Sequence, residues 1–313
     1  MKKILICGAT GFIGKNITLG LSKNKNYEIH AVRFKRPAYK TSDNVKWHKA
    51  DLRKPASIDK LIKNMDIVVQ AAATTSGSKD IVSKPYIHVT DNAVINSFIF
   101  RSAYTHEIKH FIFPSCTVMY PSSKKATKEN DFTGRIIDKY KGAGETKVYL
   151  EKIAKFYSML SKTKFTIIRH SNIYGPHDKY DLDKSHVFGA TITKVMKATD
   201  DLEVWGDGSE IRDFLHADDL VNFIQKAISK QKTQYEIYNC GSGKAITIKQ
   251  LCNLIVKISK KPLKIKFNKN KPTIKFDMFL NCNKAKKELG WEPKIEIESG
   301  IKKTVSWWIK NIK

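Results

Sequence analysis

The chain has 313 residues, 41% of them hydrophobic and 10% aromatic, so it can bury a large core in one or two domains. Its formal net charge of +27 would suit a nucleic-acid partner. However, only seven of the 57 basic residues are arginines, and the lysines are spread along the whole chain rather than gathered in one arm. We therefore expect no nucleic-acid partner.

The apolar runs and the cysteines indicate the compartment. No apolar run is long enough to cross a bilayer, and Gly8 interrupts the one at the N-terminus, which argues against a signal peptide. The five cysteines are odd in number and form no C-x-x-C pair, so we expect reduced thiols and no metal site. These features predict a cytoplasmic protein with no membrane partner.

Three glycines follow the first predicted strand. Ile-Leu-Ile-Cys at 4–7 predicts a buried parallel strand, and a helix is predicted over 15–22. Between them lie Gly8, Gly11 and Gly14, in a G-x-x-G-x-x-G spacing. Glycine lets the backbone approach a ligand, and the helix that follows offers free N–H groups to a pyrophosphate. The alternative is an ordinary glycine-rich turn, which the strand before it and the helix after it make less favourable.

The second predicted strand, 27–32, ends at Arg33. In a dinucleotide-binding fold an acidic residue at this place would bind the ribose hydroxyls of NAD. Here Arg33 is followed by Lys35 and Arg36, and such a cationic cluster suits the 2′-phosphate of NADP. We expect NADP as cofactor, with NAD possible. A solvated basic loop is the alternative.

Strands and helices alternate through the first half of the chain, which predicts an α/β fold: a Rossmann-like, doubly wound parallel sheet with a smaller C-terminal substrate-binding portion. The further strands are expected at 45–48, 65–73, 109–113 and 165–169, the helices at 58–64, 89–106 and 146–161, a polar loop at 74–78, and a surface loop at 120–140. Ligands of such sheets lie beyond the carboxyl ends of the strands. Those ends are Gly8–Gly14, Arg33, Asp51, Ala71–Ala73 and Ser115–Thr117.

The domain boundaries follow from where this alternation loosens. We expect residues 1–171 to form the dinucleotide-binding domain, with 211–238 returning to it. Residues 172–210 and 239–313 would form the substrate-binding portion.

Landmarks in order along the whole chain resemble the extended short-chain dehydrogenases/reductases, the NAD-dependent epimerase/dehydratase family. They are the glycine motif, Asp51-Leu52, Ala71-Ala72-Ala73, Asn92, Thr146-Lys147 with Glu151, Tyr174-Gly-Pro176, Arg212-Asp-Phe214 with His216 and Asp218-Asp219, and Leu289-Gly-Trp291. Within the family, Tyr174–Asp178, Ser185-His-Val187 and Val204–Gly208 most resemble the GDP-fucose synthases, which are 4-keto sugar epimerase-reductases.

The resemblance implies a role for each matched residue. The cofactor would contact Gly8, Gly11, Phe12, Ile13, Gly14, Arg33, Arg36, Asp51, Leu52, Ala71, Ala72, Ala73 and Lys147. Lys147 would also lower the pKa of a nearby proton donor. The substrate would contact Asn172, His186 as an acid in epimerisation, and Arg212 as a diphosphate clamp. Taken singly, His186 could equally be a surface or capping residue, and Arg212 a salt-bridged one.

Two departures from the family pattern concern catalysis. The family's serine or threonine position holds Cys116, flanked by Ser115 and Thr117, and its tyrosine position, four before Lys147, holds Ala143. We rank Tyr140 first as replacement proton donor, because Gly142 and Gly144 disfavour a continuous helix and would let the chain fold back. His186 ranks second and a water molecule third. The implied catalytic set is Cys116, Thr117, Tyr140, Lys147 and His186.

The resemblance implies an NAD(P)-dependent nucleotide-sugar 4-ketoreductase or epimerase, with a GDP-linked substrate possible. It also implies a homodimer and a place in polysaccharide biosynthesis. The alternative is a cofactor-binding sensor or assembly protein of the same fold that has lost catalysis, for which the missing tyrosine is the support.

Overall fold

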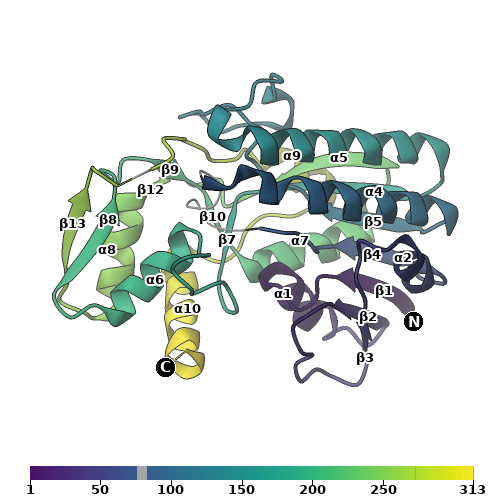
Figure 1. Ribbon diagram of the computed structural model, residues 1–313, viewed down its shortest axis with the longest axis horizontal. Coiled ribbons are helices and arrows are strands. Elements are labelled where there is room, and N and C mark those ends of the chain that lie inside the picture. The colour runs from purple at the N-terminus through teal and green to yellow at the C-terminus, as the bar shows by residue number, and fades with distance from the viewer. Residues whose placement is uncertain (76–82, 272, 313) are drawn as a thin grey trace.

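A seven-stranded sheet forms the centre of the molecule (Figure 1). The computed structural model describes residues 1–75, 83–271 and 273–312. The strands are ordered β11-β6-β5-β4-β1-β2-β3, and every neighbouring pair is parallel. They are β1 (Lys2–Cys7), β2 (Tyr27–Arg33), β3 (Val45–Lys49), β4 (Ile67–Gln70), β5 (His110–Pro114), β6 (Lys164–His170) and β11 (Tyr235–Cys240). The predicted doubly wound parallel sheet is confirmed.

The chain order reverses between β1 and β4. From β1 the chain first proceeds to β2 and β3 on one side, and then returns to build β4, β5 and β6 on the other. The loops that leave β1 and β4 therefore diverge, and the crevice between them is the place where such sheets bind a dinucleotide.

Helices cover both faces of the sheet. Figure 1 shows α4 and α5 running along one face and α1 and α7 along the other. The first layer consists of α2 (Pro55–Ile62), α4 (Thr90–Thr105) and α5 (Lys141–Leu160), and the second of α1 (Phe12–Leu21), α7 (Ala217–Lys230) and α9 (Asn283–Leu289). Successive strand side chains point to opposite faces, so Ile4 and Ile6 pack into the α1–α7 core while Leu5 and Cys7 pack into the α4–α5 core. This double burial explains why β1 is apolar throughout.

A smaller portion lies beside the sheet, at the left of Figure 1. It consists of α6 (Val187–Lys197), α8 (Ile248–Ser259), α10 (Ile297–Asn311) and three short strand pairs. The pairs are β7 (Asn172–Tyr174) with β10 (Phe214–His216), β9 (Ile211–Arg212) with β12 (Ile246–Thr247), and β8 (Asp201–Trp205) with β13 (Lys264–Asn268). Its core gathers Tyr174, Phe188, Leu251 and Trp308.

The largest departure from the predicted elements is the start of α5. This helix begins at Lys141 instead of residue 146 and runs without interruption through Gly142 and Gly144. The prediction that these glycines break the helix is therefore wrong. A Cβ at position 144 would lie 2.7 Å from Ile136 Cγ2, so this glycine permits close packing of the preceding loop on the helix rather than a turn.

Other element boundaries also differ. Helix α1 begins at Phe12, three residues earlier than expected, and β4 is confined to Ile67–Gln70. The sheet is completed by β11 rather than by the strand at 165–169. The segment 120–140 is not all surface, because Tyr120 is fully buried, and it contains the short 3-10 helices η2 (Glu129–Asp131) and η3 (Asp138–Tyr140). Another 3-10 helix, η1 (Pro85–His88), precedes α4, while residues 76–78 of the predicted polar loop lie outside the described residues.

In the described ranges, no helix is both long and apolar enough to cross a membrane. Nor do three or more potential metal ligands gather anywhere in this part of the chain.

Candidate active site

The glycine loop between β1 and α1 is held by backbone contacts. Gly8 has a φ of +73°, and a Cβ on it would lie 2.6 Å from the Ala72 Cα. A Cβ on Gly14 would lie only 2.1 Å from the Gly8 carbonyl oxygen. Gly11 caps α1 without any side-chain hydrogen bond, so the N–H groups of Phe12, Ile13 and Gly14 begin the helix at its positive end. This cradle fits a pyrophosphate, because a side chain at any of the three glycines would fill it or displace its walls.

Two arginines lie beside this loop. Arg33 is the last residue of β2, is half-buried, and has no ion-pair partner in the described part of the chain. The Arg36 Nη1 donates a hydrogen bond of 3.2 Å to the carbonyl oxygen of Thr10, inside the glycine loop. The Arg36 guanidinium therefore lies against the glycine loop, and β2 ends at Arg33 beside the same loop, where the Ala9 N–H donates to the Val32 carbonyl oxygen.

Further residues predicted to contact the cofactor follow β3 and β4. Arg53 donates to both carboxylate oxygens of Asp51, at 3.0 and 2.8 Å, and holds the pKa of that carboxyl at about 2. The Leu52 side chain is buried in the α4–α5 core, which leaves only its backbone to face a ligand. Ala71, Ala72 and Ala73 directly follow β4, and the Gln70 side chain fixes this turn by bonding both the N–H and the carbonyl of Ala72.

Lys147 lies over the end of β5. Its Nζ is 3.4 Å from the Pro114 carbonyl oxygen and 4.6 Å from the centre of the Phe113 ring. Burial lowers the pKa of this ammonium, and the nearby Cys116 and Glu151 oppose that change. Burial raises the pKa of the Cys116 thiol, against the influence of Lys147. Cys116 and Lys147 are thus electrostatic neighbours.

The hydroxyl that precedes Cys116 is committed to the core. Ser115 Oγ donates a 2.6 Å hydrogen bond to Glu151, which also forms a 2.7 Å ion pair with Arg169. All three side chains are buried. This network fixes α5 against β5 and β6. Because it engages the Ser115 hydroxyl, the side chains after β5 that could still face a ligand are those of Cys116 and the buried Thr117.

Tyr140 lies at the N-terminal end of α5, seven residues before Lys147. It is the N-cap residue of the helix and packs edge-on against Phe276, with 5.5 Å between ring centres. Burial raises the pKa of its phenol, and the charge of Arg212 partly opposes this. The predicted fold-back toward Lys147 does not occur, because α5 is continuous.

His186 caps the N-terminus of α6 and remains accessible to solvent. Desolvation by the surrounding protein, followed by the charges of Lys179, His88 and His170, lowers the pKa of its imidazole, and the solvent access of the side chain limits the desolvation part. The sequence prediction missed His170, at the end of β6, whose Nδ1 is 2.8 Å from the Ser171 carbonyl oxygen. Because a carbonyl only accepts, Nδ1 carries the proton. The only feature of the sequence that could have marked His170 as a candidate site residue is its position at the carboxyl end of the predicted strand.

Arg212, in β9, is bound only by backbone carbonyls. Its guanidinium donates to the oxygens of Ile211 (3.0 Å), Ile274 (3.1 Å) and Phe276. The salt-bridge alternative is wrong: Arg212 has no ion pair within the described residues, and Asp213 accepts instead from Ser242, Gly243 and Leu280. The Asn172 amide donates to the Asp213 carbonyl oxygen at 3.1 Å. A positive charge without a carboxylate partner therefore remains at this position.

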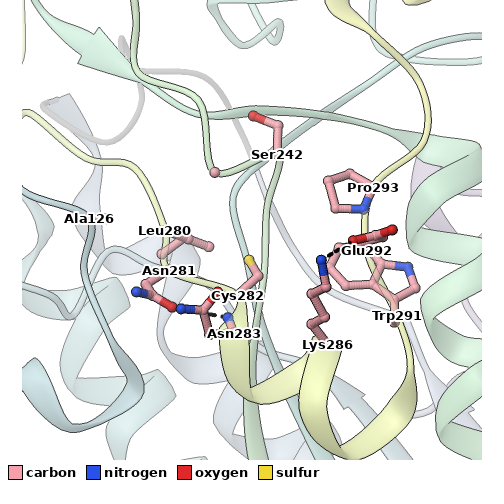
Figure 2. A pocket seen from close by; sticks show the side chains of 11 residues that line it. Ala126, Ser242, Leu280, Asn281, Cys282, Asn283, Lys286, Trp291, Glu292 and Pro293 are labelled. Atoms are coloured by element: carbon pink, nitrogen blue, oxygen red, sulfur yellow. Dashed lines mark hydrogen bonds and ion pairs between the residues drawn. The ribbon is translucent and has the colours of Figure 1, made fainter.

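Figure 2 shows a pocket of about 320 Å³ at a different place, beyond β11 and beside α9. It is lined by Ser242, Asn281, Cys282, Asn283 and Trp291 among others, and a 2.8 Å ion pair joins Lys286 and Glu292 there. None of the predicted site residues lines it. The candidate active site is instead made up of the glycine loop after β1, Lys147 over the end of β5, and Arg212 in β9.

This geometry defines a class of protein, the nucleotide-cofactor-binding enzymes with a doubly wound sheet, and comparison with known proteins gives the family. A model of the NAD dependent epimerase/dehydratase family matches residues 4–241, and the chain belongs to that family. It is 28% identical to GDP-L-colitose synthase from Yersinia pseudotuberculosis, over 98% of either chain. It is 26% identical to GDP-L-fucose synthase from Azorhizobium caulinodans, over 98% of this chain and 96% of that one.

A solved structure shows the same fold. UDP-glucose 4-epimerase from Thermotoga maritima, crystallised with UDP-glucose, superposes with a TM-score of 0.87 at 24% identity, covering 99% of this chain and 100% of that one. The family is one of epimerases and dehydratases, and the matched relatives are named as nucleotide-sugar synthases and epimerases. The protein is therefore an enzyme of this type.

Proposed function

We propose that this protein is an NAD(P)-dependent nucleotide-sugar 4-ketoreductase or epimerase, with a GDP-linked sugar as substrate. The observation that carries the proposal is the order of three groups. The glycine cradle follows β1, and Lys147 lies over the end of β5, two strands away. Cys116 and Tyr140 connect Lys147 electrostatically to Arg212. A pyrophosphate cradle, a half-buried cation and a second anion site would suit a dinucleotide, a reacting carbonyl and a sugar-nucleotide diphosphate respectively. The GDP assignment is supported by the names of the two relatives.

Each residue has a part in this reaction. The cofactor, when bound, would supply or accept a hydride. The glycine loop would hold its pyrophosphate, Ala71 to Ala73 would border it beside Gly8, and Asp51 with the Leu52 backbone would bind the adenine. Lys147 would hold the nicotinamide ribose. His186 and Asn172 would contact the sugar, and Arg212 would bind the diphosphate through the donors that its three carbonyl bonds leave free.

We also propose a preference for NADP over NAD. Arg33 supports it, because it is an unpaired cation at the end of β2, where NAD-specific enzymes of this fold carry an acidic residue. Arg36 adds a second guanidinium beside the same loop.

The protein is further proposed to act as a cytoplasmic homodimer in polysaccharide biosynthesis. The dimer is supported by the outer face of α4 and α5, which exposes Tyr104, Tyr149, Phe156, Met159 and Leu160. Monomeric soluble proteins rarely leave so many large apolar side chains on one face.

Turnover tests the proposal. The purified protein is incubated with NADPH or NADH and a GDP-linked 4-keto-6-deoxy sugar, and the product is identified by mass spectrometry. We expect oxidation of the cofactor matched by reduction of the sugar. Cofactor binding without turnover of any 4-keto nucleotide sugar would favour the sensor alternative, which draws on the absence of a tyrosine at position 143.

A further inference from the structure

The Lys147 ammonium has more N–H donors than there are acceptor atoms around it. It carries three N–H bonds, and within the described residues it has a single oxygen acceptor, that of Pro114, at 3.4 Å. The Phe113 ring contributes only a cation–π contact. No carboxylate lies within ion-pair distance of Nζ in the described ranges, and Glu151 is already bound by Arg169 and Ser115. At least one proton of this cation is therefore left for a ligand.

The helix face that carries Lys147 has no polar side chain one turn earlier. Positions i and i+4 of a helix are neighbours on one face, so Ala143 precedes Lys147 there by one turn. Ala143 is partly exposed and carries only a methyl group. One turn before Lys147, therefore, α5 offers no polar side chain that could donate a proton in its place.

The other titratable groups near Lys147 have different positions or partners. Glu151, one turn later on α5, is in the buried network, and Cys116 follows β5 with a thiol whose pKa is raised by burial. His170, at the end of β6, is neutral near pH 7 because burial lowers its pKa to about 4. Tyr140 packs against Phe276 at the Arg212 end. Lys147 alone among them is a charged acid with free protons.

We propose that Lys147 Nζ itself donates the proton to the carbonyl oxygen of the sugar. The assignment rests on the proposed function. The cofactor, when bound, would supply a hydride with its electron pair to the carbonyl carbon, whose π bond to oxygen would break. The carbonyl oxygen takes one proton from Nζ, which leaves an alcohol, a neutral amine and the oxidised nicotinamide. Solvent then returns a proton to Nζ. In the reverse direction the neutral amine accepts the proton of the alcohol.

The first experiment needs no turnover. The apo-protein is labelled with an amine-acylating reagent at a series of pH values, and the labelling of Lys147 and of the exposed Lys302 is measured by peptide mass spectrometry. Because burial lowers the pKa of Lys147, the midpoint of its labelling curve should lie at lower pH than that of Lys302. Slow access changes the rate but not the midpoint. A midpoint no lower than that of Lys302 would overturn the assignment.

The second experiment separates proton donation from positive charge. Lys147→Arg keeps the charge but holds its proton too tightly to give it up. It should bind cofactor with a Kd within about threefold of the parent, yet lose roughly 10²–10⁴-fold in kcat. Adding Ala143→Tyr to Lys147→Arg places a phenol one turn away and should restore at least tenfold. Tyr140→Phe and His186→Asn are measured alongside and should each cost less.

The outcomes are distinct. An inactive parent protein that binds cofactor would refute the proposed function. An active parent whose Lys147→Arg variant turns over at the parent rate would refute the role of Lys147 alone. A larger loss in Tyr140→Phe or His186→Asn than in Lys147→Arg would transfer the role to that residue.

Discussion

At the scale of single residues, Arg33 is the simplest test of cofactor choice. Its guanidinium has no ion pair within the described residues, so a 2′-phosphate would gain charge-assisted hydrogen bonds, each contributing about 1.5–3 kcal/mol. Arg33→Ala should therefore weaken NADPH binding by tenfold or more and leave NADH nearly unchanged, as measured by titration calorimetry. Lys23→Ala, at an exposed site after α1, is the control for lost charge. An equal loss for both cofactors, or tighter NADH binding by the parent, would contradict the NADP preference.

Arg212 is the corresponding test at the substrate end. Its bonds to three backbone carbonyls fix the guanidinium without neutralising it. Replacing it by methionine should raise the Kd of the nucleotide sugar tenfold or more, because at least one bond of about 1.5–3 kcal/mol to the diphosphate is lost.

The cofactor serves as the internal control for Arg212→Met. Its Kd should stay at the parent value, since Arg212 lies away from the glycine loop. Should the sugar nucleotide bind the variant as tightly as the parent, the arginine would be structural, as its carbonyl bonds alone would allow.

At the scale of elements, two glycines of the loop between β1 and α1 have different roles, one in packing and one in ligand contact. A Cβ at position 14 would meet the Gly8 carbonyl at 2.1 Å, whereas a Cβ at position 11 has only that oxygen within 4 Å, at 3.3 Å. Gly14→Ala should therefore lower the melting temperature and abolish cofactor binding. Gly11→Ala should fold like the parent and lose affinity for the cofactor, because its methyl group enters the open side of the cradle. Calorimetric melting and cofactor titration together check this, and equal melting losses in the two variants would contradict it.

The elements also show what the sequence can reveal. The strands were predictable because burial on both faces demands unbroken apolar runs. The residues expected to face a cofactor could be placed on one edge of the sheet because parallel strands end there together, and their role stays a prediction. The start of α5 was not predictable, because glycine is a helix breaker in isolation and only the approach of Ile136 shows why Gly144 suits a helix. His170 was missed for a related reason, since no local pattern marks a histidine whose role depends on Ser171 and on neighbours distant in sequence.

At the scale of the whole molecule, the outer face of α4 and α5 predicts self-association. Phe156 and Met159 are 48% and 68% exposed on α5. Phe156→Glu should convert a dimer into a monomer, because a buried unpaired carboxylate is costly. Light scattering coupled to size exclusion measures this, with Leu182→Glu, exposed in the smaller portion, as the control. A parent protein that is monomeric at micromolar concentration would contradict the dimer.

The continuous helix α5 has a consequence for enzyme regulation. Lys147 lies within the same twenty-residue helix that carries Phe156 and Met159, without a break between them. A rigid helix that reaches from the proposed reaction centre to the proposed subunit interface would transmit restraint in both directions. Self-association would therefore restrict the motion of the helix that carries Lys147, and ligand binding at the catalytic centre would strengthen the contact between subunits. Specific activity would then depend on protein concentration, falling on dilution and recovering when substrate is present.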